Sequence, residues 1–219
     1  MDPASAHTAE RLRAELARGA HDPGAFRAAL LDVPPPARDG WVDRVLGLTE
    51  IPDDGSSLPR DGVPYLPCPV DALLRVVDRA PVGPSDVFID IGAGVGRAAA
   101  LVHLLTGAEA IGIEIQPHLA LAARALAARL GSAPITILED DAARAASSLV
   151  AGSVFFLYCP FSGARLASLL DGLEPVARTR PLCICTVDLP LPPRPWLAID
   201  GPDVSDLAVY RVARPDETA

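Results

Sequence analysis

From residue 86 onward, the chain alternates between two hydrophobic patterns. Short continuous runs of β-branched and other apolar residues recur between longer stretches in which apolar residues return every three or four positions. The runs are typical of strands buried on both faces, and the longer stretches are typical of the helices that cover them. Together they predict an α/β fold built on a parallel sheet. Strands are expected at 86–91, 110–115, 134–139, 153–159 and 181–188, and helices at about 95–106, 117–130, 142–149 and 162–177.

Two more apolar runs follow the fifth expected strand, at 196–200 and 206–212. No helical pattern separates them, and the intervening Gly201-Pro202-Asp203 is typical of a turn. We therefore expect these two runs to form a C-terminal antiparallel hairpin that closes the sheet.

The N-terminal third of the chain shows helical periodicity and no strand pattern. Several of its periodic stretches begin at an Asp or end near a Gly, as helices commonly do. A last stretch leads into the first expected strand. Helices are expected at Thr8–Ala17, Asp22–Leu31, Asp39–Leu48 and Cys68–Ala80.

A long irregular connection is predicted at Ile51–Pro69, which is rich in Pro, Gly, Asp and Ser. Connections of this length in a small domain are usually lids, binding loops or mobile segments. We therefore divide the chain into two parts. Residues 1–67 are expected to form a helical and loop cap or lid, and residues 68–219 the α/β domain that carries the ligand site.

The first expected strand runs into a turn with three alternating glycines, Asp90-Ile-Gly92-Ala-Gly94-Val-Gly96. Glycine permits sharp turns and lets a ligand approach the main chain without meeting a Cβ. The helix that follows points its free N-terminal amides at the same turn. The segment therefore predicts a ligand cradle at the end of a strand.

The spacing of these glycines separates two classes of cofactor. A dinucleotide site has the pattern G-x-G-x-x-G beside a pyrophosphate, but Arg97 stands three residues after Gly94. A pyrophosphate would also be repelled by the carboxylate of Asp90, which suits a cationic ligand with an ammonium group. The segment resembles motif I of the class I S-adenosylmethionine-dependent methyltransferases.

This resemblance covers about residues 65–212. It implies a Rossmann-like, doubly wound, seven-stranded sheet, mostly parallel, with the C-terminal antiparallel hairpin and the N-terminal helical cap. It also implies S-adenosylmethionine as the cofactor, bound beyond the carboxyl ends of the strands. The cofactor-binding residues of the turn would be Asp90, Gly92, Gly94 and Gly96.

The second expected strand ends in Glu114, whose carboxylate can accept two hydrogen bonds from a ribose diol. Ile115 and Gln116 would then lie beside the adenine. Tyr65 precedes the helix that leads into the α/β domain. In similar enzymes this element lies over the methionine part of the cofactor, so Tyr65 would either close that side of the site or simply pack the loop onto the domain.

The third expected strand ends in Asp140-Asp141-Ala142. The resemblance places Asp141 as the acceptor of the adenine amino group and Ala142 as a donor through its amide. Asp140 stands where glycine is more usual. Either carboxylate would also serve as the cap of the helix that begins near Ala142, so the choice between the two acids stays open.

The fourth expected strand ends in Tyr158-Cys159-Pro160-Phe161, which resembles motif IV, the catalytic edge of this family. Amine-methylating members commonly have Asn or Asp, Pro, Pro and an aromatic residue there. Cys159 takes the acceptor position and is a poor acceptor, whereas Pro160 and Phe161 retain an exposed carbonyl and an aromatic wall. These four residues are the predicted catalytic residues, and Tyr158 is also expected at the cofactor. Tyr158 and Asp188 are the most plausible polar groups for removing a proton.

The amino-acid composition excludes some classes of substrate and partner. The net charge is −9, and all 19 basic residues are arginines in dispersed positions, so nucleic acid is not expected as a substrate. No apolar run is long enough to span a bilayer, so we expect no membrane partner and a cytoplasmic location. No metal site is expected, since the pair Cys183 and Cys185 has no second Cys or His pair at ligand spacing. The oligomeric state is not determined by these features.

Three functions follow in order of preference. The first is methyl transfer to a small-molecule acceptor, with oxygen slightly favoured over nitrogen because of Cys159. The second is protein or peptide N-methylation of the lysine type, since residues 87–116 are similar to the core-histone lysine methyltransferases. The third is an S-adenosylmethionine-binding regulatory module without catalysis.

Overall fold

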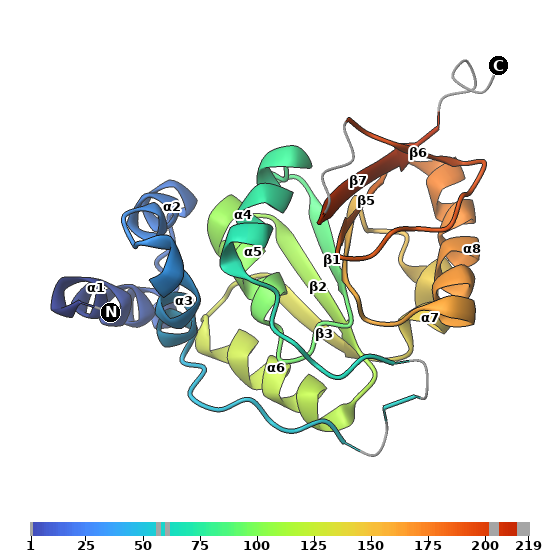
Figure 1. Ribbon diagram of the computed structural model, residues 1–219. Coiled ribbons are helices and arrows are strands. Elements are labelled where there is room, and N and C mark those ends of the chain that lie inside the picture. Colours follow the sequence, from blue (N-terminus) through green and yellow to red (C-terminus); the bar gives the residue numbers. More distant parts are fainter. Residues whose placement is uncertain (1, 56–57, 60–61, 202–205, 214–219) are drawn as a thin grey trace.

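A seven-stranded sheet forms the centre of the computed structural model, which describes residues 2–55, 58–59, 62–201 and 206–213. The strand order is β3-β2-β1-β4-β5-β7-β6, and helices cover both faces (Figure 1). This arrangement confirms the predicted doubly wound fold. The strands are β1 (Val87–Ile91), β2 (Glu109–Glu114), β3 (Ile135–Glu139), β4 (Val154–Tyr158), β5 (Cys183–Val187), β6 (Leu197–Ile199) and β7 (Leu207–Val212).

The first five strands are parallel, as predicted. The C-terminal hairpin also forms, and its second strand is the one that joins the sheet. Strand β7 lies between β5 and β6 and is antiparallel to both. The predicted turn at 201–203 lies, from residue 202 onward, outside the described residues.

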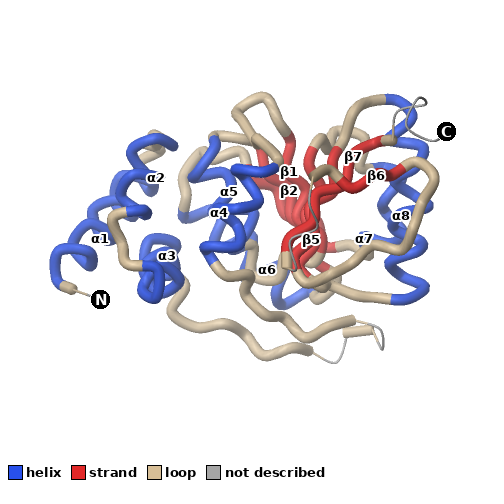
Figure 2. The backbone as a smooth tube through the Cα atoms, turned by 45° about the horizontal axis from the view of Figure 1, so that its top comes forward, coloured by secondary structure: helices blue, strands red, loops and turns tan. Residues whose placement is uncertain are grey.

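Side chains alternate between two apolar layers, one on each face of the sheet. Phe88 of β1 and Phe156 of β4 stack with their ring centroids 5.7 Å apart on one face. Ile89 and Phe155 belong to the core on the other face. Figure 2 shows α4 and α5 on one side of the strands and α7 and α8 on the other. The helices of the α/β part are α4 (Val70–Arg79), α5 (Arg97–Thr106), α6 (Pro117–Arg129), α7 (Ala142–Ala145), followed by a 3₁₀ turn at Ala146–Ser148, and α8 (Gly163–Thr179).

Three helices precede this part: α1 (Pro3–Ala17), α2 (Pro23–Leu31) and α3 (Arg38–Leu46). Helix α1 begins five residues earlier than predicted, because Asp2 caps it and accepts hydrogen bonds from the amides of Ala4 and Ser5, both at 3.0 Å. A 3₁₀ turn at Pro35–Ala37 leads into α3. None of the described helices is long and apolar enough to cross a membrane.

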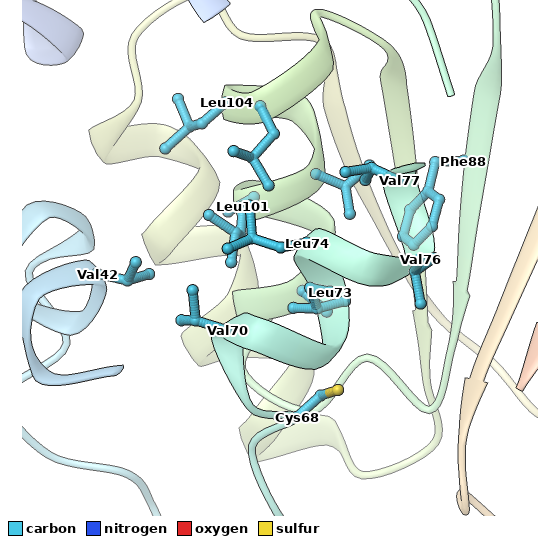
Figure 3. Close-up of a cluster of buried hydrophobic side chains, with 14 of the residues drawn as sticks. Val42, Cys68, Val70, Leu73, Leu74, Val76, Val77, Phe88, Leu101 and Leu104 are labelled. Atoms are coloured by element: carbon cyan, nitrogen blue, oxygen red, sulfur yellow. The ribbon is translucent and has the colours of Figure 1, made fainter. Parts of the chain in front are cut away.

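An apolar cluster joins the N-terminal helices to the sheet. Figure 3 shows Val70 and Leu74 of α4 beside Leu101 and Leu104 of α5, with Val42 of α3 on the left of this group. Trp41 is fully buried in the same cluster and donates from its indole nitrogen to the carbonyl of Ser5 at 3.0 Å. The cap and the sheet thus share one core. The boundary at residues 67 and 68 stays a prediction.

A buried cation fixes the cap to the helix that follows the glycine turn. Arg97, at the first position of α5, is 2% exposed. Its guanidinium donates to the carboxylate of Asp43 at 2.6 Å, to that of Asp39 at 2.9 Å and to the carbonyl of Cys68 at 2.7 Å. Asp39 also accepts from the amide of Val70, at the start of α4. Arg97 therefore holds α3 and the entry to α4 against the turn.

Replacing Arg97 by Met should lower the free energy of unfolding by about 3 kcal/mol, because a buried charge pair loses one partner. Equilibrium urea unfolding measures the loss. The matched control is Arg27→Met, since Arg27 also joins the cap to α4, through Asp78 at 2.8 Å, but at the surface. That variant should lose less than about 1 kcal/mol. Equal losses in the two variants would contradict this role for Arg97.

Candidate active site

A cavity of about 180 Å³ lies beyond the carboxyl ends of the parallel strands. The connection between α3 and α4 passes along this edge of the sheet (Figure 1). Its described residues 51–55, 58–59 and 62–66 are called the strap below, and residues 58–59 and 62–66 of the strap form one wall of the cavity. Predicted site residues that line the cavity are Tyr65, Gly92, Glu114, Ile115, Gln116, Ala142, Tyr158, Cys159, Pro160 and Phe161.

The glycine turn is tightly covered from two sides. Gly92 has φ +76°, and a Cβ there would lie 2.5 Å from the Cβ of Pro160. Gly94 has φ +54°, and its Cβ would lie 1.9 Å from the ring of Tyr65. Only glycine fits these positions, because any side chain would meet Pro160 or the strap. Gly96 is the N-cap residue of α5 and lies away from the cavity, against Ala123.

Asp90 lies beneath the turn and not on the cavity wall. Its side chain is 3% exposed and accepts a hydrogen bond from the amide of Ala99 in α5 at 3.2 Å. Burial raises the pKa of this carboxyl to about 7, with a smaller contribution from the negative charge of Glu114. Its predicted contact with a cationic ligand stays a prediction.

Glu114 links the glycine turn to the end of β2. One carboxylate oxygen accepts from the amide of Gly94 at 2.8 Å, and the other accepts from the amide of Gln116 at 2.8 Å. Burial raises its pKa, although these hydrogen bonds lower it. Each carboxylate oxygen can accept two hydrogen bonds, so both retain capacity for a ligand hydroxyl. The predicted acid therefore stands rigidly on the cavity wall.

Hydrogen bonds attach the strap to both ends of the site. The side chain of Gln116 accepts from the amide of Gly55 at 2.8 Å and donates to Asp54 at 2.7 Å. Asp54 also accepts from the amide of Tyr65 at 3.0 Å. The amide of Val63 donates to the carbonyl of Pro160 at 3.1 Å. Burial raises the pKa of Tyr65, so its hydroxyl stays protonated at neutral pH.

The two acids after β3 have different surroundings. Asp141 caps α7, accepting from the amide of Ala143 at 3.0 Å, and pairs with both terminal nitrogens of Arg165 at 2.7 and 3.1 Å. Asp140 lines the cavity beside Ala142. Arg165 also lies over the ring of Phe161, 5.2 Å from its centroid. No sequence motif marks Arg165, and only the folded structure brings it to the site.

The ends of β4 and β5 meet in two left-handed turns. Cys159 has φ +44° and Asp188 has φ +53°, a backbone conformation that residues other than glycine rarely adopt. The thiol of Cys159 donates to the carbonyl of Asp188 at 2.9 Å, so it acts as a donor within the chain. Burial raises the pKa of this thiol. Asp188, singled out in the sequence as a polar group, lines the cavity together with Tyr158.

Comparison with known proteins agrees with this geometry. A family model described as histone methylation protein DOT1 matches residues 67–132. Among curated proteins, none matches the chain. An RNA methyltransferase from Salinibacter ruber, solved in complex with S-adenosyl-L-homocysteine, is 26% identical, with a TM-score of 0.53 over 70% of this chain and 97% of that one.

Two further structures share the fold. The Escherichia coli protein yhhF, described as a candidate methyltransferase, is 18% identical with a TM-score of 0.53, over 68% of this chain and 92% of that one. A candidate caffeoyl-CoA O-methyltransferase from Staphylococcus aureus is 12% identical with a TM-score of 0.50, over 68% and 85%. The glycine turn, the strand order, the DOT1 match over residues 67–132 and the Salinibacter relative together indicate a class I S-adenosylmethionine-dependent methyltransferase, and the two further structures share its fold.

Proposed function

We propose that this enzyme methylates a small-molecule acceptor, with oxygen favoured over nitrogen. The observation that carries the proposal is the composition of the cavity wall. Glu114 and Asp140 border one end of the cavity, Cys159 and Asp188 border the other, and the strap lies across both. Cofactor and acceptor would therefore share one small cavity, which suits a compact acceptor better than an extended one.

The residues present fit the cofactor. When bound, S-adenosylmethionine supplies a methyl group activated by a positive sulfonium. Gly92 presents bare main chain to the cavity, and Glu114 would bind the ribose hydroxyls, with Ile115 and Gln116 beside the adenine. Ala142 would hold the adenine amino edge, with Asp140 as the nearer acceptor because it lines the cavity, whereas Asp141 is paired with Arg165 and would have to release it to take the predicted role. The cavity of about 180 Å³ is below the roughly 300–1,000 Å³ of typical ligand pockets, so the strap must shift outward to admit the cofactor.

Two contacts around Cys159 support oxygen as the acceptor atom. Amine methylation with motif IV uses a side-chain oxygen and an adjacent main-chain carbonyl to orient the nitrogen. Cys159 offers no such oxygen, and its thiol already donates to Asp188. The carbonyl of Pro160 already accepts from the amide of Val63. Cys159 therefore supplies no acceptor, whereas the carbonyl of Pro160 keeps one lone pair, which is enough for the single proton of a hydroxyl.

Lysine-type protein methylation is the second candidate, favoured by the match to the DOT1 family model. That match ends at residue 132, before β4 begins at Val154, so it covers the cofactor half and not the acceptor half. The Salinibacter relative is described as an RNA methyltransferase. The net charge of −9 of the present chain disfavours binding of RNA, because its phosphate backbone is also negative.

The affinity for S-adenosylmethionine should rise with pH up to about 7, because the cationic cofactor favours the ionised form of Asp90. The pKa of this carboxyl is raised to about 7, so below that pH cofactor binding must first remove its proton. Affinity should fall by up to about tenfold for each pH unit below 7. Isothermal titration calorimetry between pH 5.5 and 7.5 measures the trend.

The Asp90→Asn variant should bind at least about tenfold more weakly at pH 7.5 and lose this pH dependence. Asp206→Asn, a surface acid paired with Arg75, serves as the control and should retain both affinity and pH dependence. An Asp90→Asn variant with unchanged affinity would refute the role of Asp90. Preferential binding of NAD in the same experiment would refute the cofactor assignment.

Incubation with S-adenosylmethionine labelled in its methyl group and a size-fractionated cell extract should place the label in the small-molecule fraction. Treatment of the labelled products with mild base then distinguishes their classes. Methyl esters release labelled methanol, whereas methyl ethers and methylamines retain the label. Label in protein would favour the lysine-type alternative. Label in RNA would contradict the charge argument.

A further inference from the structure

One acid on the cavity wall has no partner for its carboxylate within the described part of the chain. Three acids line the cavity: Glu114, Asp140 and Asp188. Glu114 accepts from two main-chain amides, and Asp140 accepts from the amide of Asp141 at 2.7 Å. Among the described residues, none donates a hydrogen bond to the carboxylate of Asp188 or forms an ion pair with it. Its carboxylate is therefore open to a donor from outside the chain.

The backbone of Asp188 is held firmly, although its side chain has no partner among the residues that the structure describes. Its amide donates to the carbonyl of Asp206 at 2.9 Å, and its carbonyl accepts the thiol of Cys159 at 2.9 Å. The preceding residue, Val187, is paired with Tyr158 of β4 and with Leu207 of β7. These contacts maintain a left-handed conformation that costs free energy, and such strain in a non-glycine residue is commonly found at functional sites.

The strand order sets Asp188 apart from the cofactor-binding ends. Glu114 ends β2, and the order β2-β1-β4-β5 places two strands between it and Asp188. At about 4.8 Å per strand, the two acids follow strand ends that lie roughly 14 Å apart across the sheet. With the ribose at β2 and the glycine turn at β1, the methyl donor group would point toward β4. The next position, at β4 and β5, is then left for the acceptor.

We infer that Asp188 is a catalytic residue that binds the acceptor's nucleophilic group and takes its proton. The inference rests on the proposed function and adds a substrate class. The acceptor is a neutral or cationic molecule with a hydroxyl or amine, and carboxylate or phosphate groups as nucleophiles are disfavoured by repulsion from Asp188.

The reaction step balances without another reactant. A lone pair of the acceptor atom forms the bond to the methyl carbon, and the bond from that carbon to sulfur breaks with its electron pair remaining on sulfur. The proton of the acceptor's O–H or N–H bond passes to the carboxylate of Asp188, which releases it to solvent at the exposed mouth of the cavity. The products are the methylated acceptor, S-adenosylhomocysteine and a proton.

Equilibrium binding tests this inference without knowledge of the acceptor. Sinefungin carries a primary amine where S-adenosylmethionine carries the transferred methyl group, so its ammonium points toward the acceptor position. S-Adenosylhomocysteine has no group there. Asp188→Asn should weaken sinefungin about fivefold or more, through loss of a charge-assisted hydrogen bond, and change S-adenosylhomocysteine by less than about twofold. Calorimetry on the full chain measures both.

Asp140→Asn is the matched control, because Asp140 lines the opposite end of the cavity and should change both affinities by the same factor. An Asp188→Asn variant in which the affinities for both ligands change equally, or in which neither changes, overturns the inference but not the assignment of the cofactor. Failure of both ligands to bind the wild-type protein overturns the proposed function itself.

Discussion

The buried guanidinium of Arg97 holds the active-site end of the molecule together. It lies at the first position of α5, directly after the glycine turn, and bonds to α3 and to the carbonyl of Cys68. An uncompensated charge at 2% exposure would be costly, so these partners must remain in place. The position of the cap, the entry to α4 and the end of the strap therefore all depend on the residue that ends motif I.

Beyond Arg97, the strand ends at the site are joined by hydrogen bonds between side chains and the main chain. The amide of Gly94 and the carboxylate of Glu114 connect β1 to β2, and the thiol of Cys159 and the carbonyl of Asp188 connect β4 to β5. Such contacts fix the positions of the strand ends while leaving the carboxylate of Asp188 available for an acceptor. The result is a rigid cofactor half and an acceptor half whose chemistry depends on few side chains.

The sequence predicted the sheet well because buried parallel strands require continuous apolar runs, and each expected strand overlaps an observed one. It also predicted the cavity-lining ends of β2 and β4, since chemistry in this fold lies beyond the carboxyl ends. The sequence did not show which of Asp140 and Asp141 lines the cavity. Arg165 distinguishes them by pairing with Asp141, and Arg165 comes from α8, distant in sequence. The structural role of Arg97 was hidden for the same reason: its partners Asp39 and Asp43 are distant in sequence and carry no motif.

The central claim is that one cavity serves both cofactor and acceptor, with the cofactor on the β1–β3 side. A crystal structure with S-adenosylhomocysteine tests it most directly. The account predicts the ribose on Glu114, the amino-acid part against Gly92, and the strap displaced outward with Tyr65 still near the ligand. A ligand bound elsewhere, or one in this cavity with its ribose at Asp188 and its amino-acid part at β3, would contradict it.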